Sequence, residues 1–439
     1  SLGLVGSEMC IRERYHTYAK SLVERGLAYP CFCTEEELDK VRAKQEEDKV
    51  LTGYYGEYAT CRNLSYEEIE ANIKAGKPYV LRLRSQGSPD KEITFVDAIK
   101  GEIKLPENIH DIVLLKKDGI PTYHFAHAID DHLMRTTTVV RGGEWLASAP
   151  IHYELFHLLG FKMPAYAHTA HLMKFDEETG GKRKLSKRKD PELSLDYYRK
   201  DGYHPYTMKV YLLTLLNSNF EEWHEKFPDK DINEFPFSVE KMNQSGALFD
   251  KDKLHNICKN ELSKLSEEEL YDFLYDWAKE NEPENVEKWF SDREKMLQIL
   301  RLYMGVGAKR RRKDLMYAKQ IFELISYFFD GESAEEMDDF KLDEDMVSKI
   351  LKSYLAKYDH NDDNSVWFNK LKEIADEHGF ASDMKAYKAN PENFKGNVSD
   401  IAEAVRIAVT GRANTPDLWT IVHIMGEEQM TERIKKHIK

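Results

Sequence analysis

The sequence predicts a chain whose first part is mixed α/β and whose remainder consists of helical domains. Three observations carry this prediction. Helix and strand patterns alternate in the first third, a β-branched strand leads through a short turn into a helix near Arg141, and the apolar spacing from Pro205 onward is helical almost throughout. With 439 residues the chain is also too long for one hydrophobic core, so three or four domains are expected.

The first third combines amphipathic helices with short strands. Apolar residues follow helical spacing over 11–25 and stop at Gly26, a residue type that commonly ends helices. Thr34 followed by Glu37 predicts a capping box at the start of a second helix. Strand patterns follow at 79–84, 93–96 and 112–115.

A nucleotide-binding edge is predicted around Arg141. The β-branched run at 136–140 is typical of a strand that ends at Arg141, and a helix is expected from about Trp145 to Leu159. A strand, a short turn and a helix place Arg141 and the following amides at the carboxyl edge of a sheet. The N-terminus of the helix stabilises anions at that edge, which is where nucleotides commonly bind.

Composition narrows the class of protein. The formal net charge of −14 argues against bulk electrostatic binding to nucleic acid, although local basic stretches can still contact phosphates. Five cysteines, two of them in Cys31-Phe32-Cys33, are too few for a disulfide framework and fit a reducing compartment. The sequence has no apolar run of ~18 residues and no cleavable secretory signal, so a cytoplasmic protein without a membrane span is expected.

A basic loop, Lys184-Leu185-Ser186-Lys187-Arg188, is a candidate phosphate site. Two amines and a hydroxyl on a short loop can reach the phosphates of ATP. Each ammonium–phosphate pair at ~4 Å contributes ~4 kcal/mol at an effective dielectric constant of ~20. Point charges of this kind can stabilise a transition state. The alternative is an ordinary solvated loop, and the pentapeptide alone does not decide between the two.

Five motifs occur in order along the chain: Cys31-Phe32-Cys33-Thr34-Glu35-Glu36-Glu37-Leu38, Pro121-Thr122-Tyr123-His124, Asp130-Asp131-His132-Leu133-Met134, Arg141-Gly142-Gly143-Glu144-Trp145, and 184–189. Together they resemble bacterial glutamyl-tRNA synthetases, a family of class I aminoacyl-tRNA synthetases, and the resemblance covers roughly Glu13 to the end of the chain. Two later segments, Leu248-Phe249-Asp250 and 398–418, resemble the stem-contact and anticodon-binding regions of that family.

The resemblance implies a Rossmann-type catalytic domain, incomplete at its N-terminus, with an α+β insertion, followed by all-α stem-contact and anticodon-binding domains. The expected divisions are an unmatched tail with the remnant of the first Rossmann half at 1–17, an acceptor-end binding insertion at 18–120, the second Rossmann half with the basic loop at 121–189, a stem-contact domain at 190–305 and an anticodon-binding domain at 306–439.

The resemblance also implies a two-step reaction. Glutamate attacks the α-phosphate of ATP, supplied with Mg²⁺, to give an adenylate. A terminal ribose hydroxyl of tRNA(Glu) then attacks the adenylate and yields glutamyl-tRNA. Positioning and charge stabilisation carry such chemistry, so the absence of a recognisable protein nucleophile is consistent with it. A monomer that binds L-glutamate, ATP and tRNA is expected.

Site residues follow from the same resemblance. The catalytic loop would supply Lys184, Ser186, Lys187 and Arg188. Glutamate would be bound by Tyr123, His127 and Arg141. ATP would be bound by Glu144, Trp145, His171, Leu172 and Lys187. Alternatives from the residues themselves stay open: a structural ion pair for Arg141, a core histidine for His127 and simple packing for Trp145. His168 and His171 are spaced like metal ligands, but the resemblance assigns their segment to the adenine pocket.

Zinc is a candidate for Cys31, Cys33 and Cys61, because some relatives hold zinc with a C-x-C pair and a later C-x-H. Asn63 stands at the last position of that pattern. Asparagine is a poor zinc ligand, so Tyr54, Tyr55 or Tyr58 would have to replace it. Buried free thiols are the alternative.

Two expectations concern the start of the chain. The family's first ATP signature, a His-x-Gly-His type motif, has no counterpart in this sequence, and residues 1–11 match nothing in the family. The chain is therefore expected to be amino-terminally truncated and to show little activity by itself. A catalytically inactive tRNA-binding fragment is the alternative function. The sequence does not indicate whether a tRNA for glutamine is also charged.

A basic run, Lys309-Arg310-Arg311-Arg312-Lys313, leaves two interpretations open. It would contact tRNA phosphates if it lay on the concave face of the C-terminal domain, or it would be a solvated helix face. Phosphate contacts would make the affinity depend on salt, with each neutralised phosphate adding about 0.7 to 0.9 to the log-log slope.

Overall fold

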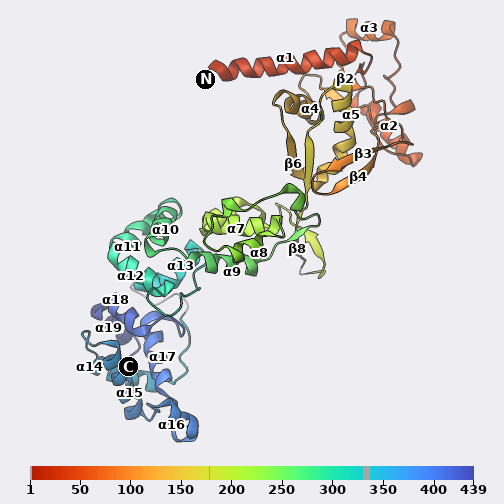
Figure 1. Ribbon diagram of the computed structural model, residues 1–439. Helices are drawn as coiled ribbons and strands as arrows, with labels where there is room; N and C mark the ends of the chain where they lie inside the picture. The colour runs from red at the N-terminus through yellow and green to blue at the C-terminus, as the bar shows by residue number, and fades with distance from the viewer. Residues whose placement is uncertain (1, 177, 330–336) are drawn as a thin grey trace. The chain divides into compact units, whose positions relative to one another are not determined.

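The structure is a computed structural model, and it describes residues 2–176, 178–329 and 337–439 (Figure 1). The chain forms two compact units. The first consists of Ser1–Lys184 with Thr214–Phe249, and the second of Leu185–Leu213 with Asp250–Lys439. Each unit has its own buried core and is described separately. Within the described ranges, no helix is long and apolar enough to cross a membrane.

The first unit contains three small sheets. One is antiparallel, in the order β1-β2-β5. A second has the order β4-β3-β7-β6, in which β7 pairs parallel with both β3 and β6. The third has the order β10-β8-β9. The strands are β1 Ala28–Cys31, β2 Val80–Leu83, β3 Glu92–Asp97, β4 Gly101–Pro106, β5 Val113–Leu115, β6 Thr138–Gly142, β7 Ala165–Thr169, β8 Leu172–Phe175, β9 Lys182–Lys184 and β10 Ala247–Leu248.

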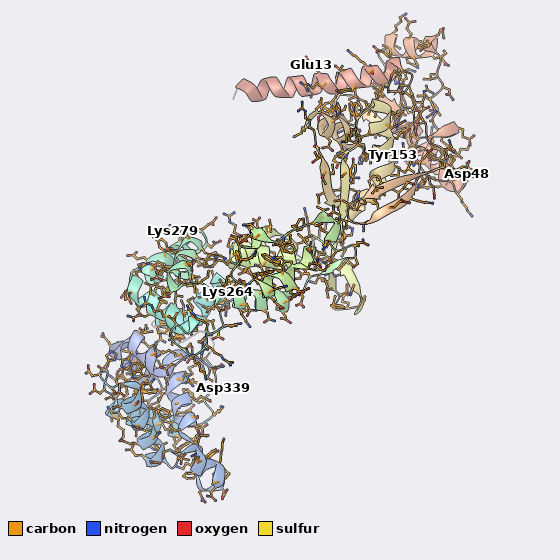
Figure 2. All side chains as sticks on the ribbon, in the orientation of Figure 1. Glu13, Asp48, Tyr153, Lys264, Lys279 and Asp339 are labelled. Carbon is orange, nitrogen blue, oxygen red and sulfur yellow. The ribbon has the colours of Figure 1, made fainter. Side chains whose placement is uncertain are left out.

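This unit also contains helices, of which the first contacts β1 and the fourth contacts β5. The first, α1, ends where the sequence indicates, because Gly26 has a φ of +69° and Leu27 N–H donates to the Leu22 carbonyl. The capping box of Thr34 and Glu37 at the start of α2 is confirmed. Asp48, labelled in Figure 2, is the residue at which α2 ends. The helices are α1 Leu2–Glu24, α2 Glu35–Glu47, α3 Tyr66–Lys74, α4 Tyr123–Leu133, α5 Ala149–Leu159 and α8 Phe220–Lys226.

The prediction was wrong in detail around Arg141. The strand β6 begins at Thr138 and continues to Gly142, so Arg141 lies within the strand. The expected helix from Trp145 is in fact a 3₁₀ segment, Gly143–Ser148, and α5 begins only at Ala149. Pro150, in the first turn of α5, explains this start, because proline lacks an N–H and suits the first turn of a helix.

The second unit is helical, as the apolar spacing predicts. Its capping box of Ser266 and Glu269 at the start of α10 is confirmed. One hydrophobic core connects helices from α9 to α19. The helices are α6 Leu195–Asp201, α9 Lys251–Leu262, α10 Glu267–Asn281, α11 Val286–Phe290, α12 Arg293–Met304, α13 Ala318–Ile325, α14 Glu344–Lys357, α15 Asn364–His378, α16 Met384–Ala389, α17 Val398–Thr410, α18 Leu418–Met425 and α19 Glu427–Lys435. One of the three chain boundaries between the units falls within α7, Pro205–Leu216.

The basic run from Lys309 to Lys313 does not form a helix face, so that interpretation was wrong. The run lies in the connection between α12 and α13. Gly305 and Gly307, with φ values of +65° and +81°, end α12 before the run begins. Within this connection, Lys313 Nζ donates to Asn260 Oδ1 at 2.7 Å.

Candidate active site

Three adjacent strands bring Asp97, His168 and Arg141 into a row. Asp97 is the last residue of β3, His168 lies in β7, and Arg141 lies in β6, directly opposite His168 in the parallel register. The register pair Asp97 and Tyr166 joins β3 to β7. Because parallel strands point their carboxyl ends to one edge, these side chains gather where β6 leads into the 3₁₀ segment.

The Asp97–His168 pair is fully buried. The carboxylate Oδ2 lies 2.6 Å from His168 Nδ1 and also accepts the backbone N–H of His168 at 3.0 Å. The other oxygen, Oδ1, accepts the N–H groups of Ile99 and Lys100. Burial opposes ionisation of Asp97, but these hydrogen bonds, first that from His168, outweigh it and hold the pKa of Asp97 below its usual value.

Arg141 is half-buried and surrounded by acceptors. Its Nε donates to His168 Nε2 at 2.9 Å, and its Nη1 lies 3.1 Å from His152 Nδ1. Its Nη2 donates to the Trp145 carbonyl at 3.3 Å, and the guanidinium carbon lies 4.7 Å from the centre of the Tyr166 ring. No carboxylate of the described residues contacts the guanidinium, so its charge is not neutralised by the protein.

The histidines beside Arg141 are neutral. Burial, followed by the nearby His127 and Arg141, lowers the pKa of His152 to about 2. His152 Nε2 lies 2.9 Å from His124 Nδ1, and burial also lowers the pKa of His124. A guanidinium can only donate hydrogen bonds, so His152 accepts at Nδ1 and carries its proton on Nε2, which donates to His124.

The predicted glutamate-binding residues lie near this guanidinium. Tyr123, the first residue of α4, is half exposed, and its ring centre lies 4.6 Å from that of Trp145. His127 lies one turn further along α4, with its ring nearly parallel to that of Tyr123. His127 Nε2 lies 2.7 Å from the Tyr166 hydroxyl, and burial lowers the pKa of His127. Tyr123, His127 and Arg141 therefore share one aromatic cluster.

Of the predicted ATP-binding residues of the first unit, Glu144 and His171 come together in a second group, whereas the Trp145 ring packs against Tyr123. His171 lies between Glu144 and Lys184: its Nδ1 is 3.5 Å from a Glu144 carboxylate oxygen, and its Nε2 is 3.5 Å from Lys184 Nζ. Leu172 begins β8, and Trp145 belongs to the 3₁₀ segment. The arrangement places a carboxylate, an imidazole and an ammonium group in sequence, so Glu144 can accept hydrogen bonds and Lys184 can bind an anion.

The basic loop is divided between the units. Lys184 ends β9 in the first unit, whereas Ser186, Lys187 and Arg188 belong to the second. The loop is anchored where Ser186 N–H donates to the buried carboxylate of Asp190 at 2.8 Å. Lys187 and Arg188 are exposed. The loop is therefore held by a turn that leaves two cationic side chains in solvent.

Sequence reasoning missed Asp97, His152 and Tyr166. Asp97 had a local signal, since an aspartate that accepts N–H groups two and three residues ahead forms a turn of its own. His168 and His171, spaced like metal ligands, have separate partners. Among the described residues, only Cys31, Cys33 and Cys61 bring three potential metal-ligand atoms together.

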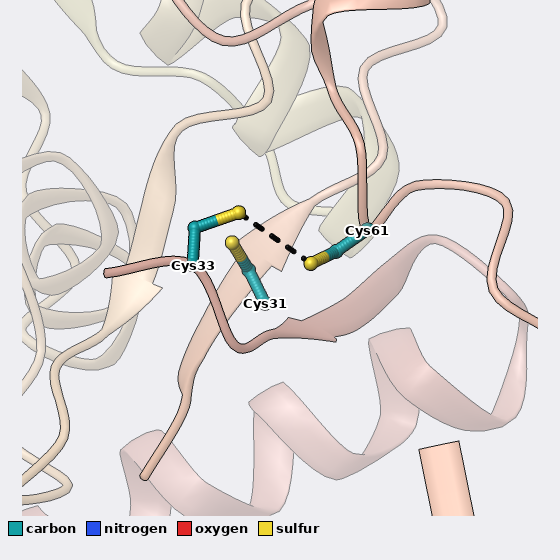
Figure 3. A group of neighbouring side chains, drawn as sticks. All are labelled: Cys31, Cys33 and Cys61. Atoms are coloured by element: carbon teal, nitrogen blue, oxygen red, sulfur yellow. Dashed lines mark hydrogen bonds between the residues drawn. The ribbon is translucent and has the colours of Figure 1, made fainter. Parts of the chain in front are cut away.

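The three cysteines point toward one another (Figure 3). Cys31 ends β1, Cys33 precedes α2, and Cys61 follows a short 3₁₀ turn; the three Sγ atoms lie within 4.8 Å of one another. Cys33 and Cys61 are 3.6 Å apart. The Tyr54 hydroxyl lies 3.4 Å from the sulfur of Cys31 and 3.3 Å from that of Cys33.

Tyr54 is the tyrosine that accompanies the thiols. The hydroxyl of Tyr55 donates to the Leu51 carbonyl, and that of Tyr58 donates to Asp48. Asn63, at the histidine position of the zinc pattern, is exposed. The cluster therefore combines three sulfurs and one phenolic oxygen.

Comparison with known proteins gives the same architecture. Residues 10–256 match the family model of tRNA synthetases class I (E and Q), catalytic domain, and residues 283–438 match an anticodon binding domain. A glutamate–tRNA ligase of Acetivibrio thermocellus is 53% identical over 426 residues, covering 97% of this chain and 77% of the relative. A glutamate–tRNA ligase of Clostridium perfringens is 46% identical, with the same coverage.

Solved structures agree. A glutamate tRNA ligase from Elizabethkingia meningosepticum, crystallised in complex with its amino acid, superposes with a TM-score of 0.73 at 25% identity. The match covers 97% of this chain and 82% of that one. The glutamate–tRNA synthetase of Elizabethkingia anophelis gives 0.72 at 26% identity.

The fold and the catalytic-domain match together define a class I aminoacyl-tRNA synthetase. Within this class, the two relatives that match 97% of this chain at 53% and 46% identity are both glutamate–tRNA ligases. The chain belongs to the glutamate–tRNA ligase family. The alternative of a tRNA-binding module without catalytic function is not favoured by these relatives.

Proposed function

We propose that this protein uses Arg141 to bind the side-chain carboxylate of L-glutamate, activates the amino acid with ATP and Mg²⁺, and transfers it to tRNA(Glu). The observation that carries the proposal is the guanidinium itself. Its charge is not neutralised by any described carboxylate, and its neighbours accept only three hydrogen bonds. A guanidinium has five N–H donors, so two are left for a substrate carboxylate.

The remaining residues divide into two groups. Tyr123 and His127 border the glutamate, with the Tyr123 ring closing one side. For ATP we propose Glu144, Trp145, His171 and Leu172 around the nucleoside, and Lys184, Ser186, Lys187 and Arg188 around the phosphates. The loop has three cationic side chains among these residues. Lys184 lies beside His171, and Lys187 and Arg188 are exposed.

The chemistry needs no covalent protein intermediate. An oxygen of the glutamate α-carboxylate attacks the α-phosphorus of ATP, and the bond to the β-phosphate oxygen breaks as pyrophosphate leaves. A ribose hydroxyl of the tRNA then attacks the carbonyl carbon of the adenylate and loses its proton, while AMP leaves. The lysines stabilise the charge that accumulates on the departing pyrophosphate, and the fixed site residues supply orientation.

Aminoacylation of tRNA(Glu) with radiolabelled glutamate tests the proposal, with pyrophosphate exchange measured in the presence of tRNA. The protein is expected to charge the tRNA, but more slowly than a version that also carries the His-x-Gly-His type motif that this sequence lacks. Removing a charge-assisted contact made in the transition state costs about 2.7 to 4 kcal/mol, so Lys187→Ala should lower kcat by about 10²- to 10³-fold. Arg141→Ala should mainly raise the KM for glutamate. An exposed lysine outside the site, Lys162→Ala, is the matched charge control.

A protein that binds tRNA but exchanges no pyrophosphate with glutamate would refute the proposal. Size-exclusion chromatography with light scattering tests the expected monomer.

For the cysteine cluster we propose a structural zinc site formed by Cys31, Cys33, Cys61 and Tyr54. Tetrahedral zinc with Zn–S distances of ~2.3 Å requires sulfurs ~3.8 Å apart. The distance of 3.6 Å between Cys33 and Cys61 fits this requirement. When bound, zinc would supply folding energy to this loop and no reaction chemistry.

Metal analysis of protein purified without chelator is expected to find one zinc per chain, and none in Cys61→Ala. Stoichiometric zinc retained by Cys61→Ala would refute the assignment, as would wild-type protein free of zinc after refolding with it. Cys258→Ala, another buried thiol that lies outside the cluster, is the control.

A further inference from the structure

We propose that Asp97 and His168 are positioning residues that orient the Arg141 guanidinium, so that a carboxylate can approach it only through its two terminal nitrogens. The inference deepens the proposed function and rests on it, because it assumes that Arg141 binds glutamate.

The first step is the direction of each hydrogen bond. A guanidinium cannot accept, so Arg141 Nε–H donates to the lone pair of His168 Nε2 at 2.9 Å. The His168 proton must then lie on Nδ1, where it donates to Asp97 Oδ2 at 2.6 Å. The carboxylate therefore selects the histidine tautomer that can accept from Arg141. A buried aspartate commonly has this role beside a histidine: it holds the proton on one ring nitrogen, so that the other nitrogen can accept.

The second step is the rigidity of the pair. Asp97 cannot rotate away without breaking contacts to three backbone N–H groups, those of Ile99, Lys100 and His168. Both side chains are fully buried in the parallel pairing of β3, β7 and β6. Lys100 is the other cation near His168, and burial together with Arg141 favours the neutral imidazole. The acceptor that faces Arg141 is thus fixed in position.

The third step is the consequence for the guanidinium. A carboxylate can pair with arginine through Nε and one terminal nitrogen, or through both terminal nitrogens. His168 occupies Nε, which closes the first approach. His152 and the Trp145 carbonyl take one N–H each of Nη1 and Nη2, leaving one N–H on each. Because the partner at Nε is a neutral histidine and not the aspartate itself, the positive charge stays available to the substrate.

The test compares five single variants and one double variant, Asp97→Asn with His168→Gln, by aminoacylation kinetics, measuring the KM for glutamate, ATP and tRNA separately. Arg141→Ala tests the proposed function. Asp97→Asn lets His168 adopt the wrong tautomer, and His168→Phe removes the acceptor. His168→Gln places an amide oxygen near the Nε2 position. Glu154→Gln is the control, a partly buried carboxylate that accepts from Asn108, Ser85 and Gln86 and does not contact Arg141.

The expected result is selective for the amino acid. Asp97→Asn and His168→Phe should each raise the KM for glutamate about 10- to 100-fold, the effect of a lost hydrogen bond to a charged group, with the KM for ATP and tRNA changed by less than about 3-fold. His168→Gln should recover most of this loss. Asp97→Asn should have no further effect in the His168→Gln background, because glutamine has no tautomer to select.

Three results would overturn the inference. The first is that Asp97→Asn and His168→Phe, both folded by circular dichroism, leave the KM for glutamate unchanged while Arg141→Ala raises it. The second is that His168→Gln is as impaired as His168→Phe. The third is that the KM values for glutamate, ATP and tRNA all rise together in the Asp97 and His168 variants, which is the pattern of a general structural defect. If Asp97→Asn does not fold, the two His168 variants carry the test. If Arg141→Ala itself leaves the KM for glutamate unchanged, the proposed glutamate site fails instead.

Discussion

His152 should make the first unit sensitive to mild acid, and the size of the effect can be calculated. The side chain is completely buried, and its pKa falls from the ordinary 6.5 to about 2 on folding. The unfolded chain therefore binds a proton at His152 below pH 6.5, whereas the folded chain does not. The contribution of His152 to the free energy of unfolding therefore falls as the pH drops below 6.5. It continues to fall until the pH reaches the folded-state pKa near 2.

The magnitude follows from proton linkage. Each pH unit below the unfolded pKa costs about 1.4 kcal/mol, so lowering the pH from about 7.5 to about 5 should remove about 2 kcal/mol through His152 alone. Two other histidines of the first unit, the buried His168 and the partly buried His110, also have lowered pKa values, and they add to the fall. A variant that cannot be protonated isolates the contribution of His152.

The variant is His152→Asn, because an amide oxygen can still accept from Arg141 at the position of Nδ1. The assay is hydrogen exchange of the amides of α5, corrected for the intrinsic pH dependence of exchange, since two units need not unfold together. Between about pH 7.5 and about pH 5, the free energy of exchange of the α5 amides should fall by about 2 kcal/mol less in the variant than in the wild type. Helix α10 of the second unit should respond equally in both proteins. An equal fall in α5 would refute the assigned pKa.

Further predictions concern single side chains. Arg141→Lys keeps the charge but has no planar fork, so the specificity for glutamate over glutamine, measured as a ratio of kcat/KM values, should fall by about 10-fold or more. Gly202→Ala should destabilise the second unit by more than about 1 kcal/mol in urea unfolding, because φ is +78° and the new methyl group would lie 2.5 Å from Ala318 Cβ. Ser266→Ala should lower the free energy of unfolding by about 1 kcal/mol in the same assay, because α10 loses its N-terminal cap. A urea midpoint equal to that of the wild type would contradict the prediction for either variant.

The sequence predicted the elements whose cause is local. The capping boxes at Thr34 and Ser266 and the helix end at Gly26 occur as expected, because each depends on backbone and side-chain groups within a few residues. The start of α5 was misplaced by four residues although its signal, Pro150, was present. The short strands β1, β4 and β7 were not predicted, because four to six residues carry little periodicity and the pairing that stabilises them is distant in sequence.

The candidate site shows the same division. Tyr123, His127 and Arg141 were identified from motifs, and the structure gathers them in one aromatic cluster. The partners of Arg141 were not identified, because His152 and His168 lie 11 and 27 residues away and contact it only once α5 and β7 have packed against β6. Motif reading therefore found the residues proposed to bind glutamate and missed the residues proposed to orient Arg141.

The sequence by itself determined the family, the order of the α/β and helical parts and the chemical types at the site, because these depend on residue identity and short-range spacing. Only the tertiary structure decided that Asp97, His168 and Arg141 form one hydrogen-bonded row. Parallel pairing of strands that are 71 and 27 residues apart created that row, and burial then fixed which nitrogen of each histidine accepts. No local pattern encodes the direction of a hydrogen bond that exists only inside the folded core.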